Sequence, residues 1–290
     1  MRLLLTAQLL LALPLAAQAP GTDIFVARLS RSGGVLKVDS AVNITARPGY
    51  DNQPGWSADA KSVYFTSQRA GQTDIYRYDL ASKTTAQVTD TPESEYSATV
   101  MPDGRHVSVI RVERDSSQRL WAFTLDGLPA KPVLDTLKPI GYHAWLNADT
   151  VFVFVLGSPA TLRRAELGYG TSVVLASDIG RGLAKVPNGR AIAFVQRDSA
   201  GGAIRTVDPV SGRTETLVRL PQGNEFFAWM PDGTLLSATG NRLLSWRAGQ
   251  TAWTDVATFD LPGLQRISRL AVSRDGSMIA LVGEEPAPPR

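Results

Sequence analysis

The chain has 290 residues, of which 43% are hydrophobic and 20% are charged, a composition typical of a folded globular protein rather than a disordered one. It has no cysteine, which excludes disulfides, a thiol nucleophile, a zinc–cysteine site and a lipid-modified cysteine anchor, and its two histidines are too few for a three-histidine metal centre. The net charge of +3 is small and scattered, so no nucleic-acid partner is expected.

The first nineteen residues have the three regions of an export signal. Arg2 is the only charge, residues 3–15 are mostly Leu and Ala, and residues 16–19 supply small side chains before a cleavage point. The apolar run is about 15 residues, shorter than the roughly 20 that a membrane-spanning helix needs. We therefore predict that residues 1–19 are a Sec-type signal peptide cleaved after Ala17 or Ala19. The remaining chain is then periplasmic or secreted, has no stable membrane span and, lacking cysteine, is not a lipoprotein.

A short motif with an Asp-Gly turn or a variant of it occurs six times after this signal. Trp56–Lys61, Val100–Arg105 and Trp229–Thr234 are three of the copies. The copies begin at residues 56, 100, 145, 185, 229 and 272, at intervals of 44, 45, 40, 44 and 43 residues. A period of this length indicates a fold assembled from repeated units.

Each copy is predicted to form strands. Asp-Gly and Asn-Gly provide the positive φ angles that a tight hairpin requires. In the first copy a β-rich run follows at 63–66, then a polar loop at 68–73, a third strand at 74–80 and a fourth at 85–89. Four strands in about 43 residues correspond to one blade of a β-propeller.

The sixth copy has room for two strands only, and the missing half is found near the N-terminus. Residues 23–29 match 74–80, and residues 43–45 match 87–89. We therefore predict an all-β fold, a six-bladed β-propeller of four-stranded blades over residues 20–290, with the last blade closed by N-terminal strands. Closure removes the open sheet edges of a linear array, and we expect a monomer.

The first copy resembles the WD40-like (PD40) propeller repeat of the TolB family. The resemblance rests on Trp56-Ser57-x-Asp59, on Phe65–Tyr76 with its Gly71 and Asp74-Ile75-Tyr76, and on Val88-Thr89-Asp90. It extends, more weakly, over the other copies. It implies the propeller of TolB without the α/β domain that precedes it in TolB, because residues 20–55 are used by the last blade. The repeat is also similar to the propeller of prolyl-oligopeptidase-like enzymes, but the chain has no Gly-x-Ser-x-Gly nucleophile elbow.

The sequence offers few residues for chemistry. It contains no EF-hand pattern and no phosphate loop. The turn residues Asp59, Asp103, Asp232 and Asp275 are interpreted as turn formers that bond nearby backbone amides. We predict no catalytic residue, no metal site and no cofactor.

The candidate binding site is therefore positional. Loops that lead into the innermost strands of a propeller surround one mouth of its channel, and the side chains just before each repeat start are not repeated, so they are free to specialise. The candidates are Asp51, Asn52, Glu95, Tyr96, Tyr142, His143, Arg181, Asn224, Glu225 and Arg266. The alternative is that these are ordinary solvated loops.

Two functions fit this sequence. The first is a non-catalytic TolB-like propeller that serves in the periplasm as a scaffold for a protein, peptide or saccharide bound at the mouth. The alternative is a hydrolase or lyase acting on a sugar or lactone in the channel. A metal-dependent enzyme of that kind would need Asp51, Asn52, Glu95, Asn224 and Glu225 to converge on one point.

Overall fold

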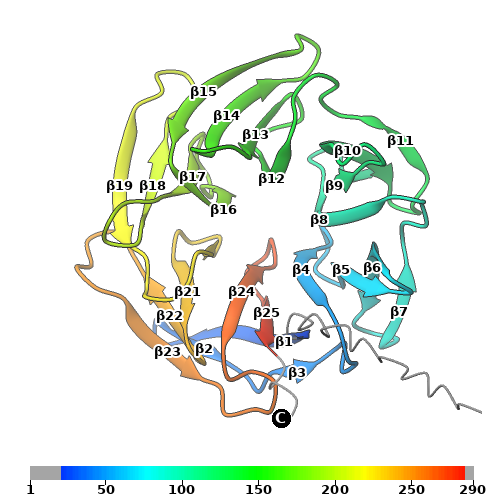
Figure 1. Cartoon of the computed structure of the whole chain (residues 1–290). Coiled ribbons are helices and arrows are strands. Elements are labelled where there is room, and N and C mark those ends of the chain that lie inside the picture. Colours follow the sequence, from blue (N-terminus) through cyan, green and yellow to red (C-terminus); the bar gives the residue numbers. More distant parts are fainter. Residues whose placement is uncertain (1–20, 285–290) are drawn as a thin grey trace, which may run out of the picture.

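The computed structural model describes residues 21–284 as six antiparallel sheets arranged in a ring (Figure 1). The predicted signal segment, residues 1–19, lies outside the described residues. Residues 21–284 form strands and turns, and they include no helix that could cross a membrane. The prediction of an all-β, six-bladed propeller is confirmed.

The strands occupy most of the described chain. In chain order they are β1 (Thr22–Ser32), β2 (Val35–Val38), β3 (Val42–Asn43), β4 (Asp51–Trp56), β5 (Ser62–Arg69), β6 (Gln72–Asp79), β7 (Thr84–Gln87), β8 (Ser94–Val100), β9 (His106–Val112), β10 (Gln118–Thr124), β11 (Pro129–Pro132), β12 (Ile140–Trp145), β13 (Thr150–Val155), β14 (Thr161–Glu166), β15 (Thr171–Ser177), β16 (Ile179–Lys185), β17 (Ile192–Gln196), β18 (Ala203–Val207), β19 (Thr214–Arg219), β20 (Ala228–Trp229), β21 (Leu235–Thr239), β22 (Arg242–Trp246), β23 (Thr254–Thr258), β24 (Ile267–Val272) and β25 (Met278–Glu284). Five blades are formed by four consecutive strands each, from β4–β7 to β20–β23, and their first strands face the centre of the ring.

The Asp residues of the motif form the hairpins between the first two strands of a blade. The side chains of Asp59, Asp103, Asp232 and Asp275 each accept a hydrogen bond from the amide two residues later, at 2.9 to 3.2 Å. This side-chain bond stabilises the turn locally, as predicted from the sequence.

The core lies between neighbouring blades. Each second strand is buried on both faces, and one cluster joins Phe152 and Phe154 of β13 to Ile179 and Phe194 of the next blade. The recurring tryptophans contribute to this packing. Trp56 Nε1 donates to the carbonyl of Ala271 at 3.0 Å, and Ala271 lies in β24 of the neighbouring blade. The propeller is therefore held together by apolar contact from blade to blade.

The closing blade combines the two ends of the described chain. β1 pairs with β25 over seven residue pairs, from Thr22 with Glu284 to Arg28 with Met278. The outer position, predicted as one strand near residues 43–45, is divided between β2 and β3, which both pair with β1. This blade thus has five strands, and its order β2-β1-β25-β24 confirms the predicted closure.

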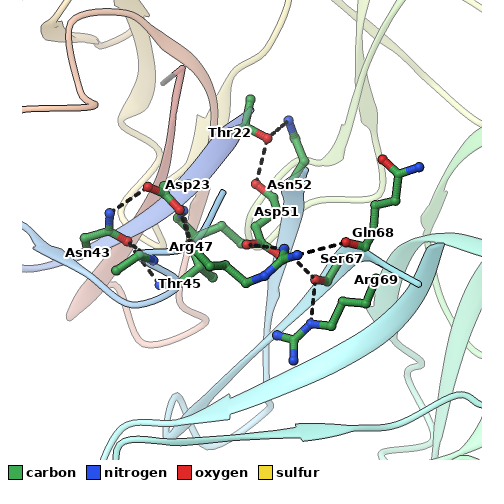
Figure 2. A network of polar contacts seen from close by, with 12 residues as sticks. Thr22, Asp23, Asn43, Thr45, Arg47, Asp51, Asn52, Ser67, Gln68 and Arg69 are labelled. Atoms are coloured by element: carbon green, nitrogen blue, oxygen red, sulfur yellow. Dashed lines mark hydrogen bonds and ion pairs between the residues drawn. The ribbon is translucent and has the colours of Figure 1, made fainter. Parts of the chain in front are cut away.

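A buried polar network joins the closing blade to the first blade (Figure 2). The hydroxyl of Thr22 donates to the carbonyl of Asp51 at 2.9 Å and accepts a bond from Asn52 Nδ2 at 3.3 Å. Arg47 donates to Asp51 Oδ2 and to the carbonyl of Gln68, both at 3.1 Å. The seam between the two chain ends is therefore fixed by polar groups as well as by the β1–β25 ladder.

Candidate functional site at the channel mouth

The inner strands are irregular where they reach the channel. Their register with the second strand shifts in five of the six blades, for example between Asn52 and Gly55 and between Tyr96 and Thr99. Gln53 and Ser97, at these two shifts, have φ angles of 57° and 56°. Bulges redirect side chains, and non-glycine residues at positive φ often mark functional positions. Here both features lie at the channel.

A cavity of about 160 Å³ occupies the centre of the ring. Every blade contributes one of the side chains that line it, and these include Gln53, Ser97, Tyr142, Arg181, Phe226 and Arg269. A wider cavity of about 500 Å³ adjoins it, shares Gln53, Tyr142 and Arg181 with it, and is also lined by Tyr96, Phe154 and Arg197. The channel therefore opens into a broader mouth between the blades that begin with β8, β12 and β16.

Aromatic rings and arginines form the wall of the channel. The guanidinium carbon of Arg269 lies 3.8 Å from the centre of the Phe226 ring and 5.3 Å from that of Tyr142. The two rings meet edge to face at 6.3 Å, and Arg269 Nη2 lies 3.4 Å from the Tyr142 hydroxyl. Cation–π contact holds the arginine against the wall, with its planar group facing flat aromatic surfaces.

Charge in the two cavities is of one sign. Arg181, Arg197 and Arg269 are among the lining residues, whereas no Asp or Glu is. Glu225 lies behind the wall, where it pairs with Arg181 at 2.6 Å and also with Arg197. Burial acts to raise the pKa of Glu225, but hydrogen bonds from the two arginines outweigh it and hold this pKa below its usual value. Glu225 thus stays ionised and neutralises one of the three cations.

His143 is a neutral, buried histidine on the channel wall. It is 8% exposed, and burial lowers its pKa to about 3. Its Nε2 lies 2.7 Å from Ser108 Oγ, which donates to the carbonyl of Thr99 at 3.1 Å and accepts from Trp145 Nε1 at 2.9 Å. Because the hydroxyl has one proton and two lone pairs, Nε2 carries the histidine proton in the arrangement that satisfies all these groups. The other nitrogen, Nδ1, is an acceptor without a hydrogen-bond partner in residues 21–284.

The structure brings four of the predicted site residues to the two cavities. They are Tyr96, Tyr142, His143 and Arg181. Glu225 supports the wall from behind, and Asn224 bonds the Ile267 carbonyl and the Phe226 amide. Arg266 pairs with Glu284 at 3.2 Å, away from the cavity lining.

The remaining predicted residues lie in the joints between blades. Asp51 and Asn52 belong to the seam of Figure 2. Glu95 is fully buried, accepts a hydrogen bond from the Thr91 hydroxyl at 2.6 Å, and has Arg111 at 3.7 Å. The side chains of Asp51, Asn52, Glu95, Asn224 and Glu225 are thus bonded to separate groups. Within residues 21–284, no three His, Cys, Asp or Glu side chains form a group that could hold a metal ion.

The sequence-based list did not include Arg197, Ser97 or Arg269. A stricter use of the repeat would have found Ser97 and Arg269. The position three residues before each of the six repeat starts holds a residue that lines the central cavity, namely Gln53, Ser97, Tyr142, Gly182, Phe226 and Arg269. Arg197 follows β17 and reaches the mouth from a different loop, so the repeat gives no indication of it.

Burial makes Glu95 a pH-sensitive element of the fold. It raises the pKa of this carboxyl from 4.5 to about 7, against the hydrogen bond from Thr91 and the charge of Arg111, while Asp74 adds to the rise. The unfolded chain ionises Glu95 near pH 4.5, whereas the folded chain keeps the proton until about pH 7. The contribution of Glu95 to the free energy of unfolding therefore falls as pH rises through this window.

As the pH rises from 4.5 to 7.5, we expect the free energy of unfolding of Glu95→Gln to increase by about 3 kcal/mol relative to that of the wild type, because Gln cannot ionise. Urea unfolding at the two pH values measures the difference. Replacement of the exposed Glu215 by Gln is the matched control. Its free energy of unfolding should differ from that of the wild type by the same amount at both pH values. A pH-independent difference for Glu95→Gln would show that the buried carboxyl does not titrate in this window.

Comparisons with known proteins identify the class of fold. A protein assigned to TolB from Agrobacterium tumefaciens superposes with a TM-score of 0.73 at 18% identity, over 92% of this chain and 99% of that one. TolB from Acinetobacter baumannii superposes with a TM-score of 0.58 at 17% identity, over 90% of this chain and 64% of that one. An oligogalacturonate lyase in complex with manganese has a TM-score of 0.60 at 15% identity, over 85% and 80% of the two chains.

These likenesses show the fold. The chain is a β-propeller, and more particularly a six-bladed propeller whose fold is similar to that of these TolB structures. No family model matches the sequence. No curated protein matches it either.

Proposed function

We propose that this chain is an exported, non-catalytic TolB-like propeller that serves in the periplasm as a scaffold and binds a protein segment, peptide or saccharide at the channel mouth. The observation that carries the proposal is the mouth cavity of about 500 Å³, in which Tyr96, Tyr142 and Phe154 lie beside Arg181 and Arg197. Aromatic and arginine side chains are the groups that dominate binding surfaces. The export signal predicted at residues 1–19 accounts for the periplasmic location.

Affinity capture from the organism's own periplasmic extract tests this function. The wild-type protein is expected to retain a partner that the double variant Tyr96→Ala/Tyr142→Ala loses, because the double variant removes two rings from the mouth. Tyr169→Ala is the matched control, since Tyr169 is 80% exposed on the loop between β14 and β15. Equal retention by the double variant would overturn the proposal.

A hydrolase or lyase acting on a sugar or lactone is the second candidate. One observation favours it, namely that an oligogalacturonate lyase has a similar fold, and the neutral His143 is among the residues that line the central cavity. The manganese of the lyase has no equivalent set of His and acidic ligands among residues 21–284, so we derive no metal-dependent step. Turnover of sugar acids or lactones that is lost in His143→Phe would establish this alternative.

A further inference from the structure

We propose that the channel binds a small carboxylate, or the carboxylate end of a longer ligand, on Arg269. This inference rests on the proposed function and names the chemistry of the ligand.

Arg269 is a cation without a counterion. Among residues 21–284 it makes no ion pair, and its contacts are the rings of Phe226 and Tyr142 and the Tyr142 hydroxyl. Arg269 is also only partly exposed, so its charge is incompletely hydrated. A guanidinium has five N–H donors, and most of those of Arg269 remain available to a planar, bidentate carboxylate.

The surrounding charge attracts an anion. Three arginines line the two cavities and Glu225 neutralises one of them, which leaves an excess of two positive charges. Tyr50 lies near Arg269 and Tyr142, and burial raises its pKa to about 12, so its phenol stays neutral. Within a recess, such an excess of one sign focuses the field and concentrates ligands of the opposite sign.

His143 adds no charge to this cavity. Its side chain is among the lining residues, and burial lowers its pKa to about 3, so the imidazole is neutral at physiological pH. Its Nε2 is bonded to Ser108 and its Nδ1 is buried, so Arg269 is the group that anchors the anion.

The volumes of the two cavities limit the size of the acidic group that can bind. A cavity of about 150 Å³ holds a molecule the size of benzene, so the central cavity of about 160 Å³ admits one small acidic group. The remainder of a longer ligand would occupy the mouth cavity of about 500 Å³. Two sources share this chemistry, namely a sugar acid and the free carboxyl terminus of a peptide.

Isothermal titration of the exported protein distinguishes these sources. One arm uses glucuronate with glucose as its neutral partner, and the other uses acetyl-Ala-Ala with a free carboxylate and the same peptide amidated. At least one acid is expected to bind more tightly than its neutral partner. The arm that binds identifies the source. If neither acid binds, or if each binds no better than its neutral partner, the inference is overturned.

Variants locate the site. Arg269→Gln is expected to weaken binding of the acid about tenfold or more, because a charge-assisted hydrogen bond is lost. The exposed Arg213→Gln is the matched control, with affinity within about twofold of wild type. Equal affinity of Arg269→Gln and wild type would refute the assignment, and thermal melts establish that each variant is folded.

The outcome separates this inference from the proposed function. If the mouth captures a partner while neither acid binds, the scaffold role holds and the carboxylate site fails. If an acid binds through Arg269 while no partner is captured, the carboxylate site holds and the scaffold role fails.

Discussion

Removal of residues 21–45 is expected to abolish cooperative folding. β1 places Ile24, Phe25, Val26, Ala27 and Leu29 in the buried core. Burying one large apolar side chain contributes about 1.5–3 kcal/mol, and the net stability of a domain is about 5–15 kcal/mol. The truncated chain also exposes the edge of β25, which is a template for aggregation. Circular dichroism and size-exclusion chromatography of the truncated protein provide the measurement.

A circular permutant is the control for this deletion. Thr22 and Glu284 are paired neighbours in the ladder between β1 and β25, so a short linker can join residue 284 to residue 22. New ends between Tyr169 and Gly170 fall in an exposed turn between β14 and β15. The permutant, with every strand present, should melt cooperatively. A truncated chain that melts at the wild-type temperature would contradict the closure.

Phe152→Ala is expected to lower the free energy of unfolding by about 3–5 kcal/mol, the cost of deleting a large core aromatic. Phe152 in β13 is fully buried in the cluster that joins the third and fourth blades in chain order. Most of its neighbours in this cluster lie in paired strands, and this pairing limits how far they can move to refill the cavity. Urea unfolding at neutral pH measures the change.

The control for Phe152→Ala is Val173→Ala. Val173 is 51% exposed on the outer strand β15, and a substitution there should change stability by about 0.5 kcal/mol or less. A Phe152→Ala variant as stable as Val173→Ala would show that the contact between these blades contributes little to folding.

The repeat made most of the fold predictable. Asp-Gly turns such as Asp103-Gly104 and Asp232-Gly233 fix hairpins by local bonds, and a regular interval between them sets the number of blades. The match of residues 23–29 to 74–80 predicted how the ring closes. The division of the outer strand into β2 and β3 depends on pairing across the blade rather than on a local motif.

The site was predictable only in outline. Tyr96, Tyr142, His143 and Arg181 were predicted to line the channel or its mouth because they lie just before a repeat start. A propeller directs that part of every blade to its channel. The same rule also selected Asp51 and Glu95, whose side chains instead serve the joints between blades. Which way a side chain turns at a bulge depends on neighbouring blades, and one repeat unit carries no information about them.

Arg269 illustrates the remaining gap. Its residue type suggests an ordinary surface cation, and its role follows only from the ring that brings Phe226 and Tyr142 beside it. That Arg269 has no acidic partner among residues 21–284 is equally a property of the assembled channel, since Glu225 is paired with Arg181 and Arg197.

Site-specific photo-cross-linking in the cells that produce the protein tests most directly whether the channel mouth is the binding surface. A photoreactive phenylalanine analogue replaces Tyr96 at the mouth or, in the control, the exposed Tyr169 on the outer edge of the ring. We predict a discrete cross-linked product from position 96 that is absent from position 169 and is lost when Tyr142 is replaced by Ala. A product from position 169 alone, or equal products from both positions, would contradict a binding site at the mouth.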